Sequence, residues 1–171
     1  MDIFPIGQEK KKKVHRLYSD ITSDLKKKGI HQWDCFYPNR FVINSDIKLG
    51  HLFGILIDNQ VIGVIVLDTN ENKQFQSLKW MDERGRPLMI HRLGIHPLYQ
   101  GRGYGKKLLG FAGEYAISNG FSSMRLDVFS GNKGALKMYE HAGFQERGEI
   151  CYPFRSAPYI CFEKIVTRSE S

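Results

Sequence analysis

The chain has 171 residues, 42% of them hydrophobic, which suits one domain with its own core. No apolar run approaches the roughly 20 residues of a membrane-spanning helix, and the N-terminus lacks the pattern of a signal peptide, so we expect neither feature. The three cysteines, Cys35, Cys151 and Cys161, have no metal-type spacing and indicate reduced thiols in a cytoplasmic protein.

The formal net charge of +7 at pH 7 favours an anionic partner, such as nucleic acid, a membrane surface or a phosphorylated small molecule. Much of the excess lies in two lysine runs, residues 10–13 and 26–28. Neither run has aromatic residues between its lysines, and no nucleic-acid motif appears in the sequence. Solvated helix faces are therefore the favoured interpretation, and we expect neither a nucleic-acid nor a membrane partner.

The first element is an amphipathic helix at about residues 9–28, where apolar residues recur at helical spacing. Gly29 is a helix stop, and Ile30 can close the cap. A short helical or irregular stretch follows at residues 32–46, because Pro38 argues against one continuous helix.

A β-hairpin comes next. Residues 51–57 and 61–68 are rich in β-formers, and Asp58-Asn59-Gln60 between them predicts the turn. Residues 74–81 fit either another strand or an irregular loop, and residues 84–87 form a turn.

A strand at residues 88–95 leads into a glycine-rich loop. Gly94 within the strand indicates a bulge or a close backbone approach, and Pro97 ends it. The loop opens a helix at about residues 103–119, which Gly120 stops.

The C-terminal part adds three strands and one helix. Residues 124–129 and later 144–151 and 159–166 alternate as strands. Asn132 is a good N-cap for a helix that Gly143 stops. This order predicts a single α/β domain over residues 1–171, with one mixed sheet, helices on both faces and a parallel right-handed crossover at the glycine-rich loop.

The glycine-rich loop is the strongest chemical signal: Gln100-Gly101-Arg102-Gly103-Tyr104-Gly105. Glycine at alternate positions lets backbone N–H groups turn inward, and the helix that begins there adds unpaired N–H groups and a positive dipole end. Arg102, Lys106 and Lys107 add charge. A strand that feeds such a loop predicts a phosphate or pyrophosphate site.

Two well-known phosphate loops do not fit. A Walker-type P-loop needs another glycine spacing and a Ser or Thr after its lysine, where this chain has Lys107. The dinucleotide fingerprint needs a third glycine where the chain has Lys106. A glycine-rich turn without a ligand remains the plain alternative.

The loop resembles motif A of the GNAT N-acetyltransferase superfamily, Gln/Arg-x-x-Gly-x-Gly/Ala, and matches it in full. A second stretch, residues 132–144, resembles the family's Asn-x-x-Ala-x-x-x-Tyr-x-x-x-Gly-Phe signature. The two motifs cover about residues 88–145. The resemblance implies a mixed, mostly antiparallel GNAT-type sheet and an N-acetyltransferase that moves an acetyl group from acetyl-coenzyme A (acetyl-CoA) to a primary amine. It implies direct attack in a ternary complex. The His, Cys, Asp and Glu residues show no metal-ligand cluster, so we expect no metal.

The resemblance also assigns roles to residues. Cofactor contacts are implied for the motif A loop with Lys106, for Asn132, and for the strand segment Leu93, Gly94 and Ile95, where the N–H of Leu93 is a candidate donor to the thioester carbonyl. Tyr139 resembles the general acid that protonates the departing thiolate, and it lies about two helical turns from Asn132, so both face the same way. From periodicity alone, a core tyrosine is an equal alternative.

The general base is less well defined, because the strand before the loop carries no carboxylate. His91 could serve, since it shares a sheet face with Leu93 and has a suitable unperturbed pKa. A structural histidine is the alternative, and Asp82 and Glu83 fit a solvated turn.

The acceptor is expected to be a small-molecule or peptide amine, bound after the first helix and by the last two strands. Trp33 and Tyr37 are the first candidates, followed by Asp34, Trp80, Tyr152, Phe154, Arg155 and Tyr159. Most aromatic residues of a domain are core residues. A homodimer would be the commonest closed assembly. Two rival functions remain: a non-catalytic acyl-CoA sensor on the same fold, and a nucleic-acid-binding module that uses the lysine runs.

Overall fold

The computed structural model describes residues 2–166, which divide into two compact units. Unit 1 contains the described residues up to Leu67 together with Arg92–Leu108. Unit 2 contains Asp68–His91 and the described residues from Leu109 onward. The single domain expected over residues 1–171 remains a prediction.

Within residues 2–166, seven strands form one sheet in the order β1-β2-β3-β4-β5-β7-β6. The pairs β1–β2, β2–β3, β5–β7 and β6–β7 are antiparallel and β4–β5 is parallel, which confirms the mixed, mostly antiparallel α/β fold. The bounds are β1 (Ile3–Pro5), β2 (Leu52–Ile57), β3 (Gln60–Asp68), β4 (Pro87–Ile95), β5 (Ser123–Phe129), β6 (Gln145–Ile150) and β7 (Tyr159–Ile165). The part of the chain that the structure describes also forms the helices α1 (Lys11–Lys27), α2 (Arg40–Lys48), α3 (Tyr104–Ser118) and α4 (Lys133–His141).

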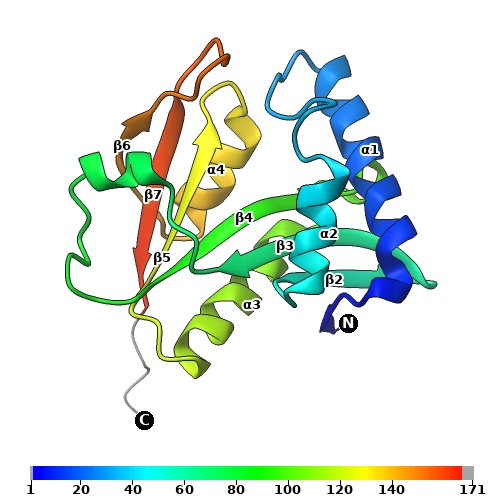
Figure 1. The fold of residues 1–171 in the computed structure, drawn as a ribbon, viewed down its shortest axis with the longest axis horizontal. Coiled ribbons are helices and arrows are strands. Elements are labelled where there is room, and N and C mark those ends of the chain that lie inside the picture. Colours follow the sequence, from blue (N-terminus) through cyan, green and yellow to red (C-terminus); the bar gives the residue numbers. More distant parts are fainter. Residues whose placement is uncertain (1, 167–171) are drawn as a thin grey trace. The chain divides into compact units, whose positions relative to one another are not determined.

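In unit 1, α1 presents its apolar side to the core and lies beside α2 (Figure 1). The apolar residues that recur at helical spacing along this helix are all buried: Val14, Leu17, Tyr18, Ile21 and Leu25. The helix ends as predicted. Gly29 adopts a φ of 70°, and the N–H of Ile30 donates to the carbonyl of Leu25 at 2.9 Å, which closes a Schellman cap.

The hairpin of β2 and β3 turns where the sequence predicts. Asp58 and Asn59 both have positive φ, and Gln60 already pairs with Ile57. Strand β3 is buried from Val61 to Asp68, as expected for a strand covered on both faces.

Two elements of unit 1 go beyond the sequence interpretation. Of the two alternatives for the stretch 32–46, the short helical one is correct for its second half: α2 begins after Asn39, whose side chain accepts from the N–H groups of Phe41 and Val42, and it continues to Lys48. Strand β1 was not predicted, because three residues at a sheet edge carry no readable alternation.

In unit 2, β5 pairs with β7 along its whole length, and α4 begins at its predicted cap, where the side chain of Asn132 accepts from the N–H of Ala135 at 3.1 Å. Residues 73–77 form a short 3₁₀ helix, so the irregular alternative for this segment is the correct one and the strand is wrong.

In the part of the chain that the structure describes, no helix is long and apolar enough to cross a membrane.

Candidate functional site

The glycine-rich loop lies in unit 1, between the short 3₁₀ turn Pro97–Tyr99 and the start of α3 at Tyr104. Gly101 and Gly103 have φ values of 74° and 82°, which L side chains rarely adopt. A Cβ built on either glycine would meet no atom within 4 Å. Backbone conformation therefore selects glycine at both positions, and the surface of the turn is open.

The backbone N–H groups of residues 101–106 are the chemical content of this loop. Among the described residues, none of these six N–H groups donates a hydrogen bond to the protein; the first paired N–H is that of Lys107, which donates to the carbonyl of Gly103 at 3.0 Å. They stand at the N-terminal, positive end of a 15-residue helix. Such a group of free donors is suited to bind phosphate oxygens.

Positive side chains surround the loop. Arg102 lies over the ring of Tyr99, 5.4 Å from its centroid, while Lys106 and Lys107 are exposed on the first turn of α3. The end of α1 adds Lys28, whose Nζ donates to the side-chain carbonyl of Gln100 at 3.2 Å. The sequence could not assign Lys28 to this site, because the two residues are 72 positions apart.

The segment of β4 that precedes the loop has one unusual backbone position. It is Arg92, with a φ of 47°, rather than the predicted Gly94. A Cβ on Gly94 would lie 2.7 Å from Cδ1 of Ile21 and 3.2 Å from Cη2 of Trp33. Gly94 is therefore required by close side-chain packing, and the strand changes direction one residue before Leu93.

Arg92 is held from three sides within unit 1. Its guanidinium forms two hydrogen bonds of 2.7 Å with the buried carboxylate of Asp46 on α2, and a third of 2.8 Å with the hydroxyl of Tyr37. The hydroxyl of Tyr18 donates to its backbone carbonyl at 3.1 Å. Burial alone would lower the pKa of Arg92, but Tyr37 and Asp46 raise it, so the charge is retained. Sequence reasoning missed Arg92 and Asp46.

A groove of about 860 Å³ lies between α1 and the segment 31–43 of unit 1. Tyr18 and Trp33 line it, and both contact the Arg92–Gly94 segment of β4. Trp33 is only 6% exposed, so its role in the groove is to form a wall. The hydroxyl of Tyr37, the second predicted acceptor residue, is bonded to Arg92 instead.

In unit 2, β4 and β5 separate after a short parallel stretch. Their pairing runs from Pro87↔Ser123 to Met89↔Arg125 and then stops. The next residues on that face of the two strands are His91 and Asp127, because side chains alternate along a strand. We call these two residues, at the point where the strands part, the fork.

Each fork residue has a defined partner. Nε2 of His91 lies 3.0 Å from Oδ1 of the buried Asp68. Asp127 accepts a hydrogen bond of 3.0 Å from the hydroxyl of Tyr152, and that hydroxyl accepts one of 2.7 Å from the side chain of Asn72. Burial raises the pKa of Asp127, against the opposing effects of the Tyr152 hydroxyl and the charge of His91.

Tyr139, the predicted general acid, is a buried residue of α4 in unit 2. Its ring packs against Phe144 and Phe162, with centroids 5.8 and 6.2 Å away. Burial, and next the charge of Asp127, raise the pKa of its hydroxyl well above the usual value. Only 7% of Tyr139 is exposed to solvent.

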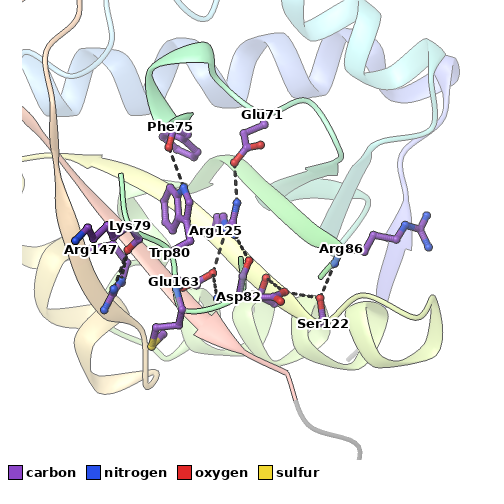
Figure 2. A network of polar contacts seen from close by, with 12 residues as sticks. Glu71, Phe75, Lys79, Trp80, Asp82, Arg86, Ser122, Arg125, Arg147 and Glu163 are labelled. Carbon is purple, nitrogen blue, oxygen red and sulfur yellow. Dashed lines mark hydrogen bonds and ion pairs between the residues drawn. The ribbon is translucent and has the colours of Figure 1, made fainter. Parts of the chain in front are cut away.

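A polar network fixes the connection between β3 and β4 in unit 2 (Figure 2). Arg125 bonds Glu163, Glu71 and the carbonyl of Asp82, and its guanidinium lies 4.3 Å from the ring centroid of Trp80. Trp80, considered above as an acceptor residue, is therefore packed into this structural network.

Asp82 is likewise part of the framework instead of a solvated turn. Its carboxylate accepts from the hydroxyls of Ser122 and Ser123. Burial alone would raise the pKa of Asp82, but these hydroxyls, the N–H of Gly85 and the charge of Arg125 lower it below its usual value.

The remaining acceptor candidates have separate surroundings within each unit. Tyr152 and Tyr159 pack ring to ring at 4.8 Å, whereas Phe154 is fully exposed and Arg155 lies in the same loop. In unit 1, Asp34 accepts from the N–H groups of Phe36 and Tyr37 and lines the groove. Glu83 is exposed.

Comparison with known proteins extends over most of the chain. The model of the acetyltransferase (GNAT) family matches residues 13–144. An uncharacterized N-acetyltransferase, YycN, of Bacillus subtilis (strain 168) is 40% identical over 57 residues, which are 33% of this chain and 36% of that protein. A thialysine N-epsilon-acetyltransferase of Bos taurus is 33% identical over 75 residues, or 42% of this chain and 44% of that protein.

The first curated relatives are thus matched over only 36% to 44% of their own length. Structural similarity covers much more of the chain than these sequence matches do. A GNAT-family acetyltransferase from Streptococcus agalactiae 2603 has a TM-score of 0.82 at 20% identity, covering 98% of this chain and 96% of that one.

Proposed function

Because the chain belongs to the acetyltransferase (GNAT) family, we propose that it transfers an acetyl group from acetyl-CoA to a primary amine by direct attack in a ternary complex. The observation that carries this proposal is the row of unpaired N–H groups at residues 101–106. A helix N-terminus with free donors, next to Arg102, Lys106 and Lys28, is complementary to a diphosphate, and coenzyme A contains one.

The residues present fit this cofactor. Gly101 and Gly103 leave the surface of the turn open, so the N–H groups can be reached by phosphate oxygens. Gln100 holds Lys28 near the loop and is itself anchored by a bond from its amide to the carbonyl of Ile95 at 3.1 Å. Bound acetyl-CoA would supply an activated acetyl carbon with a thiolate leaving group.

Leu93 and Tyr139 would act on that chemistry. The N–H of Leu93 follows the constrained Arg92 and is the proposed donor to the carbonyl oxygen on which negative charge develops. The hydroxyl of Tyr139 keeps its proton at neutral pH, since its pKa is raised, and is the proposed donor to the thiolate. Gly94, Ile95 and Asn132 remain proposed cofactor contacts.

The acceptor is proposed to be a small-molecule or peptide amine that enters the groove beside α1. Trp33 and Tyr18 connect this groove to the Arg92–Gly94 segment, which supports an acceptor position there. The relative named thialysine N-epsilon-acetyltransferase supports the amine class, since thialysine carries a primary side-chain amine.

The proposed diphosphate site at the N–H groups of residues 101–106, here called the cradle, is tested by one pair of glycine substitutions, one in the loop and one on α3. Gly103→Glu places a carboxylate against the free N–H groups, so calorimetry should show loss of acetyl-CoA binding. Gly110→Glu is the matched control, because Gly110 is exposed on α3 and an added Cβ meets nothing within 4 Å.

Gly110→Glu should bind acetyl-CoA like the wild type. In assays with a panel of amines, the rate of acetyl transfer by Gly110→Glu should match the wild type, and the rate by Gly103→Glu should fall with its loss of binding. Unchanged affinity in Gly103→Glu would remove the cradle assignment. Binding by the wild type with no transfer to any amine would support an acyl-CoA sensor instead.

A further inference from the structure

The groove beside α1 lies wholly in unit 1, and its lining carries an excess of positive charge. We propose that this groove selects an amine that also carries an anionic group, a carboxylate or a phosphate, which Lys26 and Arg40 bind. This inference rests on the proposed function and deepens it, because it gives the chemical class of the acceptor.

The cations of the groove are Lys26, near the end of α1, and Arg40, the first residue of α2. Both residues are exposed, and within residues 2–166 neither side chain bonds a carboxylate. The guanidinium of Arg40 lies over the ring of Phe41 instead, 4.9 Å from the ring centroid. An aromatic ring orients a cation without neutralising it, so both charges remain available to a bound anion.

The groove offers little negative charge to offset these cations. Among the described residues that line it, Asp34 is the one carboxylate. Its Oδ1 already accepts from the N–H groups of Phe36 and Tyr37, at 2.8 and 2.9 Å. Asp34 therefore serves to shape the segment between α1 and α2, and the lining keeps its positive excess.

Helix α1 separates its charges by face. The residues that it contributes to the groove recur at helical spacing and are polar or cationic, apart from the buried Tyr18: His15, Ser19, Thr22, Ser23 and Lys26. The two carboxylates of α1 do not line the groove. Asp20 lies 3.5 Å from Nε2 of His96, and Asp24 accepts from Lys28 at 2.6 Å. The acidic side of the helix thus pairs with its own cations, while the groove side keeps its lysine unpaired.

This charge pattern discriminates between kinds of amine. An unperturbed alkyl amine has a pKa of about 10.4, so an acceptor arrives in the groove as an ammonium at neutral pH. Two uncompensated cations repel an acceptor that has only positive charge, whereas they attract one that also carries an anion. Repulsion of the wrong ligand contributes to specificity as attraction does. The groove is therefore suited to a zwitterionic amine and disfavours a polyamine.

The two ends of the groove suit the two groups of such a molecule. Tyr18 and Trp33, whose rings pack edge to face at 5.4 Å, connect the groove to the Arg92–Gly94 segment of β4, and an ammonium can lie against these rings. Lys26 follows Tyr18 by eight positions on α1, about 12 Å at the helical rise. Helical side chains lean toward the N-terminus, so an anion several bonds from the amine is within its reach.

The test uses pairs of acceptors that differ in the anionic group. L-lysine is compared with L-lysinamide, and O-phosphoethanolamine with ethanolamine, in steady-state transfer assays with acetyl-CoA. We expect kcat/KM to be about tenfold higher for the anionic member of a pair, as two exposed ion pairs allow. A preference in the first pair assigns a carboxylate, and a preference in the second pair assigns a phosphate.

A double variant tests the two cations. Lys26→Gln with Arg40→Gln should bring the ratio of kcat/KM within the preferred pair to about 1, mainly through KM for the anionic member. Arg16→Gln with Lys27→Gln is the matched control, because both residues are exposed on α1 and neither lines the groove. The control should keep the preference of the wild type. Calorimetry with acetyl-CoA checks that both double variants are folded.

A readout that does not need turnover is an amide NMR titration of ¹⁵N-labelled protein with L-lysine, L-lysinamide and O-phosphoethanolamine. The anionic amine that the assays prefer should shift the amides of Lys26, Arg40 and their neighbours saturably in the wild type, and far less in Lys26→Gln with Arg40→Gln. L-lysinamide should shift them little in either protein.

Two results would overturn the anionic acceptor: equal kcat/KM for the members of both pairs, or an unchanged preference after both cations are removed. Absence of transfer by the wild type to every amine would instead overturn the proposed function. In that case the NMR titration still decides whether the groove binds an anionic amine, so the two failures are distinguishable.

Discussion

Tyr139 has a buried ring that packs against Phe144 and Phe162, and burial raises the pKa of its hydroxyl, so the proton stays on the oxygen at neutral pH. The sequence places it two helical turns from Asn132, and the structure has both on α4, one at the N-cap and one in the last turn. The pattern alone could not separate a core tyrosine from an acid, because the position of the hydroxyl depends on residues packed from β7.

Tyr139→Phe removes the proton and keeps the ring. We expect kcat for acetyl transfer to fall by about 10²-fold, while the Kd of acetyl-CoA changes far less, because the phosphate contacts are elsewhere. Tyr115→Phe on α3, where the ring stacks on Phe121, is the matched control. Equal kcat in Tyr139→Phe and wild type would show that Tyr139 is only a core residue and not the general acid.

Among the elements, α2 and β4 are joined by the Arg92–Asp46 pair. Both side chains are largely buried, with exposed fractions of 10% and 8%. The pair holds Arg92 in its left-handed conformation and thereby sets where Leu93 points its N–H. A polar residue of a short helix thus supports the backbone that the proposed chemistry uses.

Asp46→Ala would leave the Arg92 charge buried without its carboxylate, so unfolding in urea should show a loss of about 3–5 kcal/mol. Asp24→Ala breaks an exposed pair with Lys28 on α1 and should lose at most about 1 kcal/mol. Similar losses in the two variants would contradict a buried, stabilising tie.

Periodicity was sufficient for the long elements. The apolar stripe of α1 and its Gly29 cap, the hairpin turn at Asp58-Asn59 and the Asn132 cap all lie where local sequence predicts them. The start of α2 was missed because Pro38 obscures it, although Asn39 is an N-cap signal that was available. The 3₁₀ helix at residues 73–77 is joined to the segment that follows it by the bond from the indole N–H of Trp80 to the carbonyl of Phe75. Trp80 is positioned in turn by the distant Arg125, whose guanidinium lies over its ring.

Over the whole molecule, the glycine-rich loop of unit 1 and the fork of unit 2 differ in how far sequence can predict them. The glycine-rich loop is local, since glycine spacing and a helix start determine its free N–H groups. The fork is assembled from residues far apart: Tyr152 is 25 positions from Asp127 and 80 from Asn72, and Asp68 is 23 from His91. No short motif contains them, so this cluster could not be predicted from the sequence.

The central claim is that the N–H groups of residues 101–106 bind the diphosphate of coenzyme A, and amide NMR tests it most directly. Titrating ¹⁵N-labelled protein with coenzyme A should shift the amide signals of these six residues strongly and saturably, while the amide of Gly110 on the same helix shifts little. Saturable binding that leaves the signals of residues 101–106 unmoved would contradict the account.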